Sequence, residues 1–554
     1  MLRLRAEDFT AKLPWFYHGL PFNPRAEHDI LSFEVYALPL QGDHTVTLVV
    51  AEARDWLEFS LDGRHFERLP ARDGLVPLPP FDLTRRRLSF YVRSEAPDRP
   101  CPVAEVLVHP PGAAPSEARA APLFEAYVRD IGTDESEALT RWDEFWPLLN
   151  ERHFGASDLR EMFQALLGWC EGRQVIDEAD PHFGAIYSEE DKYDFRDAAA
   201  AAVAFTYAWR DNSDERWRQR ARMARRYVYR GQHAEGERRG GWAHMVSGKW
   251  GGDHQVDFRR ITQPLPPVDG VDTAIVIGLL CRAIDLGLEP DAQDLQHVRL
   301  GAEWIARSEL RPGVFAHHEG ATHDCQNSNA LAAMALSRAH RTLTAAGQEA
   351  PDEWLEAAMR GAMHYLGGQE AIGVWPYRFA EIGRGQRFGE QNVPDQGMGL
   401  YHFLVAAEAL GLDGRSDVRE ALRRAARWYL CTCRIDEGDP QPTIDLQYQR
   451  EGGGLLFSSF TWCRFMAAAA LLRIAGVSGE QQPWRNLALR LMEHVRRKLW
   501  NACDRERSPV VASCRPDIEL HSWIAAAEWE AVLLREMVEE LQRAGNEGRP
   551  APER

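Results

Sequence analysis

The stretch Gly313-Val314-Phe315-Ala316 opens the part of the sequence that decides the fold. A polar loop follows this turn, and an alanine- and leucine-rich run from Asn329 to Leu343 then leads to Gly347. The same layout recurs three times. The other turns read Gly241-Trp242-Ala243-His244, Gly373-Val374-Trp375-Pro376 and, more loosely, Gly454-Leu455-Leu456-Phe457, and the other apolar runs are Asp272 to Leu286, Gly397 to Leu410 and Thr461 to Ala475.

A regular period separates these repeats. The glycines that follow the apolar runs are Gly287, Gly347, Gly411 and Gly476, which lie 60, 64 and 65 residues apart. A period of this size indicates stacked supersecondary units. Since amphipathic helices alternate with the apolar ones, we expect helical hairpins with the apolar helices in an inner ring. Six or so such hairpins favour a closed (α/α)6 toroid over an open solenoid, which would have atypical capping repeats.

The first part of the chain has a different pattern. Short runs rich in β-branched and aromatic residues, such as 45–50 and 88–92, are separated by turns such as Asp62-Gly63. This pattern predicts a small antiparallel β-sandwich, so the expected fold class is multidomain α+β. The predicted parts are a β-sandwich domain at 1–112, a linker and lead-in helix at 113–154, an all-α toroid at 155–545 and a disordered tail at 546–554.

Composition limits the partners. The 554 residues carry a formal net charge of −18, which argues against nucleic acid and anionic membranes because like charges repel. No uninterrupted apolar stretch is long enough for a transmembrane helix. The start, Met1-Leu2-Arg3-Leu4, lacks the apolar core of a secretory signal. We therefore expect a cytoplasmic protein, or a secreted or periplasmic one if a signal has been removed; the oligomeric state stays open.

The cysteines predict neither a disulfide framework nor a metal site. There are nine of them, without framework spacing, so reduced thiols are expected. Cys431-Thr432-Cys433 is spaced too closely for a zinc knuckle, and packing at a helix end is the favoured interpretation. We expect no metal and no cofactor.

Acidic residues gather where the predicted inner helices begin. In a toroid, the loops before the inner helices open at one end, so residues far apart in sequence meet there. Each acid has two interpretations, since a carboxylate at a helix start also caps free amides. The candidate catalytic carboxylates are Asp272, Asp324, Glu390 and Asp395.

Histidines gather in the same loops. Five of the 19 histidines lie in two of these loops, and such a cluster indicates chemistry near neutral pH. They are His244, His254, His317, His318 and His323. The further catalytic candidates are His318, His323, Asn327 and Tyr401.

Aromatic, amide and guanidinium groups accompany these residues, as in a groove that binds sugars by stacking and by hydrogen bonds. The candidates for substrate binding are Trp242, His244, Trp250, Arg259, Trp375, Tyr377, Arg378, Gln396, His521 and Trp523. A Trp repeated in each turn has a second interpretation as a wedge between adjacent hairpins. That interpretation is at least as good for Trp242 and Trp375.

The combination resembles the six-hairpin toroid superfamily, which includes many glycosidases and polysaccharide lyases, over about 155–545. Two local sequences carry the resemblance. They are Gly373-Val374-Trp375-Pro376-Tyr377, followed by Pro394-Asp395-Gln396-Gly397, and His323-Asp324-Cys325-Gln326-Asn327-Ser328-Asn329. The resemblance implies a catalytic toroid with a carbohydrate substrate. The same repeat also resembles terpenoid cyclases, but instead of their Asp-x-Asp-Asp motif the chain has only Asp269-Gly270-Val271-Asp272.

Three hypotheses about function follow. The leading one is a glycoside hydrolase that cleaves an oligo- or polysaccharide with two carboxylates. The close alternative is a polysaccharide lyase or epimerase that abstracts the C5 proton of a uronate, with Asn, His or Arg neutralising the sugar carboxylate and His or Tyr as base. The third is a toroid that binds glycans without turnover or acts in the manner of a terpenoid cyclase.

Overall fold

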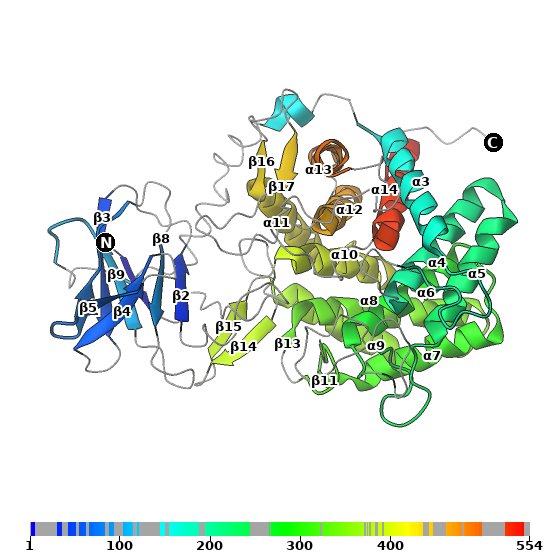
Figure 1. Cartoon of the computed structure of the whole chain (residues 1–554), viewed down its shortest axis with the longest axis horizontal. Helices are drawn as coiled ribbons and strands as arrows, with labels where there is room; N and C mark the ends of the chain where they lie inside the picture. Colours follow the sequence, from blue (N-terminus) through cyan, green and yellow to red (C-terminus); the bar gives the residue numbers. More distant parts are fainter. Residues whose placement is uncertain are drawn as a thin grey trace. The chain divides into compact units, whose positions relative to one another are not determined.

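The computed structural model describes residues 2–5, 30–35, 43–50, 55–61, 66–82, 88–93, 103–114, 119–120, 145–149, 154–187, 194–243, 265, 267–321, 324–369, 373, 375, 378–382, 386–390, 393–435, 443–446, 461–478, 481–500 and 527–547. The chain divides into two compact units. The first comprises Met1–Glu144, Ala380–Glu390 and Gln449–Leu456, and the second Phe145–Phe379, Gln391–Tyr448 and Phe457–Arg554. Figure 1 draws the strands of the first unit mostly in blue and the helices of the second from cyan to red.

The N-terminal strands form two sheets. Their orders are β10-β1-β9-β3-β6, with β7 beside β3, and β2-β8-β4-β5. Their bounds are β1 Leu2–Arg5, β2 Ile30–Val35, β3 Asp43–Val50, β4 Trp56–Ser60, β5 Glu67–Pro70, β6 Leu75–Pro77, β7 Phe81–Asp82, β8 Leu88–Arg93, β9 Val103–His109 and β10 Arg119–Ala120. The described pairs are antiparallel, except that β1 and β10 run parallel.

Both sheets contribute to one hydrophobic core. Leu48 of β3 and Val106 of β9 come from one sheet, and Phe59 of β4 and Phe90 of β8 come from the other. Alternate residues of each strand point to the same face of its sheet. On the faces that share this core, these side chains are buried. Two sheets with a shared core support the predicted antiparallel sandwich in part, since the β1–β10 pair is parallel.

The second unit is built from alternating buried and amphipathic helices. The buried helices are α4 (Phe195–Asn212), α6 (Gly270–Asp285), α8 (Gln326–Ala345), α10 (Val393–Ala409), α12 (Thr461–Ser478) and α14 (Ala527–Glu547). The amphipathic helices are α3 (Ala156–Arg173), α5 (Glu215–Tyr229), α7 (Ala292–Arg307), α9 (Asp352–Gly367), α11 (Ser416–Thr432) and α13 (Gln481–Lys498). Small side chains explain why the first set lies inside: Ala198 to Ala202 in α4 are fully buried, which permits close approach from several sides.

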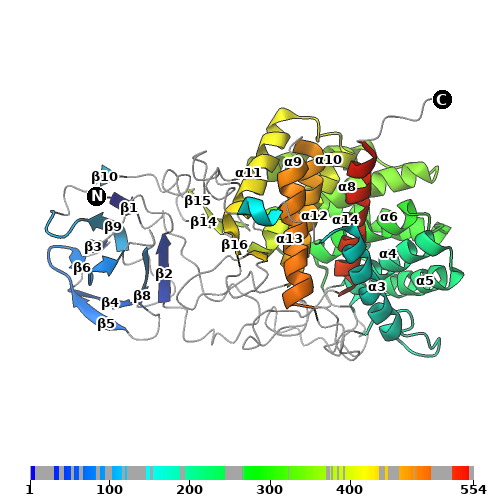
Figure 2. The same cartoon turned by 90° about the horizontal axis from the view of Figure 1, so that it is seen from above.

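The six buried helices close into a ring. Each contacts the next in the order α4, α6, α8, α10, α12, α14, and α14 returns to α4. In Figure 2, α14 lies between α12 and α4. The unit is therefore a six-hairpin (α/α)6 toroid, as predicted. An open solenoid is excluded by the contact of α14 with α4.

Neighbouring inner helices run in the same direction. Arg196 and Asp272 pair near the starts of α4 and α6, and Tyr207 and Arg282 pair twelve residues after those starts. α4 and α6 therefore begin at one end of the ring, here called the N-terminal rim, and finish at the other, the C-terminal rim. α8 runs in the same direction, because Asp285 and Arg341, the sixteenth residues of α6 and α8, also pair. Inner and outer helices alternate along the chain, so each outer helix returns the chain to the N-terminal rim before the next inner helix begins.

A glycine with positive φ opens each described hairpin turn. The φ angles of Gly184, Gly240, Gly313 and Gly373 are 93°, 93°, 80° and 96°. A Cβ at these positions would lie 2.0, 2.0, 2.6 and 2.3 Å from carbonyl oxygens of α5, α7, α9 and α11, respectively. The turn glycine of the second repeat is thus Gly240, and the predicted turn at Gly241 is one residue out of register. The predicted turn at Gly454 lies outside the described residues.

Glutamine side chains lock three of these turns. The amides of Gln174, Gln232 and Gln369 each donate to the carbonyl of the turn glycine, at 3.4, 2.8 and 3.1 Å. The same amides donate to a carbonyl in the next outer helix, at 2.9, 3.0 and 2.8 Å. One side chain therefore satisfies buried carbonyls on both sides of the junction between hairpins.

Short strands complete the connections. Their bounds are β11 Glu309–Arg311, β12 Val314–Phe315, β13 Asp324–Cys325, β14 Arg378–Ile382, β15 Gln386–Glu390, β16 Cys433–Ile435 and β17 Ile444–Leu446. β13 pairs with the start of β14, where Asp324 lies opposite Phe379. This pairing holds the chain segment before α8 beside the segment that leads toward α10.

Candidate active site

Two inner helices begin with the same pair of aspartates. Asp194 caps α4 by accepting a hydrogen bond from the Arg196 backbone at 2.8 Å, and Asp197 is the third residue of that helix. Asp269 caps α6 by accepting from the Asp272 backbone at 2.9 Å, and Asp272 is the third residue. All four are buried. Asp194 and Asp269 therefore act as N-caps. The predicted candidate Asp272 lies in the first turn of its helix, three residues after the N-cap.

Arg196 joins these carboxylates across the two helices. Its guanidinium lies 3.2 Å from Asp272 and 3.8 Å from both Asp194 and Asp197. Burial alone lowers the pKa of Arg196, but Asp194, Asp272 and Asp197 outweigh it and the pKa is raised. A permanent cation thus orients several buried carboxylates at the N-terminal rim. We did not predict Arg196, although Asp194-Phe195-Arg196-Asp197, a cation between two acids at a helix start, indicates it.

Asp395 occupies the same place in its repeat. It is the third residue of α10, as Asp197 is of α4 and Asp272 of α6. Its side chain lies outside the described part of the structure, so its position is given by the backbone alone. In α8 the third residue is Ser328.

Asp324 has structural partners on every side. Its carboxylate accepts hydrogen bonds from His364 at 2.8 Å, Asn329 at 3.0 Å, Gln326 at 3.1 Å and Arg311 at 3.2 Å. Burial raises the pKa of Asp324, but the bonds and charges of His364, Asn329 and Arg311 outweigh it and lower the pKa. These contacts tie the start of α8 to α9, which favours the structural interpretation of Asp324 over a catalytic one.

His318 lies beside the start of α6. It forms a backbone bridge with Asp269, and its Nδ1 is 3.3 Å from Nδ1 of the partly exposed His317. Asn327, by contrast, is buried in the first turn of α8, where its oxygen accepts from the Cys325 thiol at 2.8 Å. Of the two, His318 is the one placed near the aspartates of the N-terminal rim.

Tyr401 lies deep inside the ring. Its hydroxyl donates to Glu536 of α14, and the Arg473 guanidinium lies 5.4 Å from the centre of its ring. Burial raises the pKa of Tyr401, and the charge of Glu536 raises it further. A phenol that is held protonated in this way is poorly suited to act as a base.

The predicted substrate-binding residues Trp242 and Trp375 lie in the turns, and Gln396 of α10 accepts from the Trp375 backbone. Trp242 and Trp375 are buried, and their indoles donate to backbone carbonyls of Val228 at 2.9 Å and Tyr365 at 2.6 Å. Their position favours the alternative interpretation as wedges between hairpins.

A polar side chain at the fourth position of three inner helices holds these turns. Thr273, Asn329 and Gln396 accept from the backbone N–H of Trp242, Phe315 and Trp375, at 2.9, 2.9 and 2.8 Å. Gln396 therefore has a positional equivalent in each of the two preceding repeats. Its contacts are those of a turn clamp.

The other candidates are only partly visible. His244, Trp250, Arg259, His323, Tyr377, His521 and Trp523 lie outside the described residues, and Arg378 and Glu390 lie in β14 and β15 with side chains outside them. Among the residues that are described, no group of three His, Cys, Asp or Glu side chains is placed to hold a metal. In the same part of the chain, no helix combines the length and apolar character needed to cross a membrane.

No protein-family model and no curated protein matches the sequence. Solved structures do resemble it. The unsaturated glucuronyl hydrolase of Bacillus sp. GL1 is 15% identical over 70% of this chain and 97% of its own, with a TM-score of 0.49. A D-mannose isomerase is 11% identical over 71% and 100%, with a TM-score of 0.49. The GH76A α-1,6-mannanase of Salegentibacter sp. HEL1_6 is 11% identical over 69% and 99%, with a TM-score of 0.46.

Proposed function

We propose that the toroid is a carbohydrate-active enzyme that hydrolyses glycosidic bonds of an oligo- or polysaccharide at its N-terminal rim. Hydrolysis requires two carboxylates on either side of the scissile bond, one acting as proton donor and the other as base or nucleophile. Asp272 is the proposed base or nucleophile, and Asp395 the proposed proton donor.

One observation carries this assignment: Asp197, Asp272 and Asp395 share the third position of three inner helices that begin at the same rim. A ring of parallel helices directs equivalent positions toward one opening, so carboxylates from different repeats come together there. The ion pair with Arg196 fixes the direction of Asp272, as a group that must meet one sugar atom requires.

A second reaction is favoured by His318. A lyase or epimerase acting on a uronate needs a base for the C5 proton, and an imidazole beside the start of α6 supplies one. In that reaction the rim aspartates would position the histidine and would not attack the sugar. Tyr401, the other base considered, is disfavoured by its bond to Glu536.

The two reactions give different products. Wild-type protein is incubated with neutral and uronate-containing glycans while reducing ends and the ultraviolet absorbance of unsaturated uronates are followed together. Reducing ends without absorbance, lost in Asp272→Asn and Asp395→Asn, support hydrolysis. Absorbance that is lost in His318→Gln supports elimination. Saturable glycan binding without either product supports a binding protein.

We also propose that the N-terminal strands form an antiparallel β-sandwich domain at about 1–112, with the toroid at about 155–545. The shared core of the two sheets supports the sandwich. Expression of 1–112 alone tests this division, since a domain with its own core unfolds cooperatively.

A further inference from the structure

The thirteenth residue of every inner helix lies at one level of the ring. In chain order these residues are Tyr207, Arg282, Arg338, Val405, Arg473 and Glu539. Five of the six are polar although they belong to apolar helices. Such a layer, about three turns from the N-terminal rim, has no role in the proposed hydrolysis.

A cavity of about 100 Å³ opens at this level. Its lining contains five arginines, which are Arg282, Arg338, Arg341, Arg473 and Arg543. Four glutamates and Val405 complete the lining. We call this cavity the arginine chamber. A space of this size accommodates several waters or one phosphate-sized ion.

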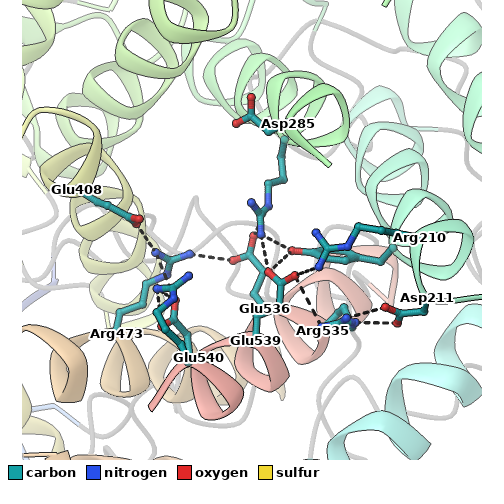
Figure 3. Close-up of polar contacts among 12 residues, drawn as sticks. Arg210, Asp211, Asp285, Glu408, Arg473, Arg535, Glu536, Glu539 and Glu540 are labelled. Atoms are coloured by element: carbon teal, nitrogen blue, oxygen red, sulfur yellow. Dashed lines mark hydrogen bonds and ion pairs between the residues drawn. The ribbon is translucent and has the colours of Figure 1, made fainter. Parts of the chain in front are cut away.

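The glutamates of the chamber are already paired. Glu536 lies between Arg282 and Arg473, at 3.3 Å from each, and Glu539 accepts from Arg282 at 2.8 Å. Figure 3 shows Glu536 and Glu539 of α14 at the centre of this network, with Arg473 on one side and Arg210 and Arg535 on the other. Glu540 accepts from Arg543 at 3.0 Å. These ion pairs neutralise the negative charge that lines the chamber.

Arg338 is the cation without such a partner. It is 8% exposed, its Nη1 donates to the Gly278 carbonyl at 3.0 Å, and its Nε has no hydrogen-bond partner within the described part of the chain. No carboxylate of the described residues lies within ion-pair distance of it. Burying a guanidinium in this state is costly unless an anion compensates it.

The electrostatics agree with this geometry. Burial lowers the pKa of Arg338, and the nearby charge of Arg282 lowers it further, against the opposing charge of Glu536. With five arginines and four glutamates, the lining itself carries one excess positive charge when all are ionised, and outside the lining Asp285 pairs with Arg341 at 2.6 Å. The chamber is also reachable, because the Arg341 and Arg543 side chains at its mouth are 52% and 57% exposed.

We propose that the arginine chamber binds a small oxyanion of phosphate type, with Arg338 as its principal buried ligand. Guanidinium groups bind oxyanions with pairs of parallel hydrogen bonds, and the hydrogen bond described for Arg338 uses only its Nη1. This site lies about three helical turns from the rim aspartates along the inner helices. It is therefore a second site, independent of the proposed hydrolysis.

Calorimetric titration of the full chain with inorganic phosphate tests the proposal, with sodium chloride holding the ionic strength constant. Wild-type protein is expected to bind one phosphate saturably and Arg338→Met to bind it at least tenfold more weakly. Arg338→Lys should retain part of the affinity, because it keeps the charge but loses the planar fork. Arg360→Met is the control, because this variant also loses one positive charge. Arg360 lies on the surface of α9 and pairs with Glu309 of β11.

A variant at the mouth keeps the test decisive if Arg338→Met does not fold. Glu408 is 57% exposed and pairs with Arg473 at 3.1 Å, so Glu408→Gln should fold and tighten phosphate binding several-fold. Glycerol 3-phosphate is titrated in parallel. If only inorganic phosphate binds, the free ion is the ligand; if both bind, the ligand is the terminal group of a phosphate ester. No saturable binding to wild-type protein, or unchanged affinity in both Arg338→Met and Glu408→Gln, would overturn the proposal.

Discussion

Arg196 of α4 donates to the carboxylate of Asp272 of α6 at 3.2 Å, and this contact joins the starts of two neighbouring inner helices. It is a cross-helix pair between the second residue of one helix and the third residue of the next. An ion pair with both side chains this buried is not needed to cap either helix, since Asp194 and Asp269 do that. At the rim, this ion pair therefore serves to orient the Asp272 carboxylate.

Replacing Asp272 by Asn is expected to reduce glycan cleavage by about 10²–10⁴-fold while the protein stays folded, because the amide keeps the shape but cannot act as base or nucleophile. Initial rates and circular dichroism of the same preparations provide the check. Asp285→Asn is the matched control: Asp285 is the last residue of the same helix and pairs with Arg341 at the other rim. Equal loss in both variants would contradict a catalytic role for Asp272.

Asp324 should matter for stability. Replacing it by Ala leaves His364, Asn329 and Arg311 without their shared acceptor, and we expect a loss of about 3–5 kcal/mol in the free energy of unfolding. Urea denaturation measures this loss. Asp417→Ala, on the exposed surface of α11, should change the midpoint little. Wild-type stability with lost activity in Asp324→Ala would instead make Asp324 catalytic.

The turn glycines should differ from the glycines that follow the inner helices. Gly373→Ala combines a φ of 96° with a Cβ 2.3 Å from the Arg424 carbonyl oxygen, so we expect a loss above about 2 kcal/mol. Gly347→Ala has a φ of 72° but nothing within 4 Å of the added Cβ, so the cost should be about 1 kcal/mol of backbone strain. Thermal unfolding of the two variants side by side tests the difference. Equal losses of stability in the two variants would contradict a steric clash between the Cβ added at Gly373 and the Arg424 carbonyl of α11.

Acid should weaken the toroid through His402. Burial lowers the pKa of His402 to about 4, and the charge of Arg338 contributes, although the bond to the Met398 carbonyl opposes the shift. Because the folded pKa is below the unfolded value, the stabilising contribution is complete above about pH 6.5 and is lost as the pH falls toward 4. The full contribution is about 3 kcal/mol.

The pH profile of unfolding in wild type and His402→Gln measures this contribution. The difference between the two free energies of unfolding should shrink between pH 6.5 and 4. A difference that stays constant over this range would show that His402 does not titrate there.

The repeat was readable from the sequence because its period and its apolar helices depend on local chemistry. The register of the turns was not, since Gly240 and Gly241 are adjacent and are distinguished by the positive φ of Gly240 and its close approach to Leu300. Asp272 and Asp395 were found as acids at helix starts, but their equivalence depends on the true first residues of α6 and α10. The N-cap of α6, Asp269, lies three positions before the apolar run that begins at Asp272, and α10 begins at Val393, four positions before the run that begins at Gly397.

Long-range pairing explains the other differences. Tyr401 was predicted to face a substrate, but it meets Glu536, which is 135 residues away in sequence. The arginine chamber has a sequence signal that was overlooked: Arg282, Arg338 and Arg473 are isolated charges at one depth of three apolar helices. Which of them lacks a partner depends on where α14 places its glutamates.

The most direct test of the account is a two-channel assay of wild-type protein and Asp272→Asn on a panel of neutral and uronate-containing glycans. We predict that wild-type protein generates reducing ends without ultraviolet absorbance on at least one substrate, and that Asp272→Asn does not. Absorbance rising with the reducing ends, or full activity in Asp272→Asn, would contradict hydrolysis by the carboxylates of the N-terminal rim.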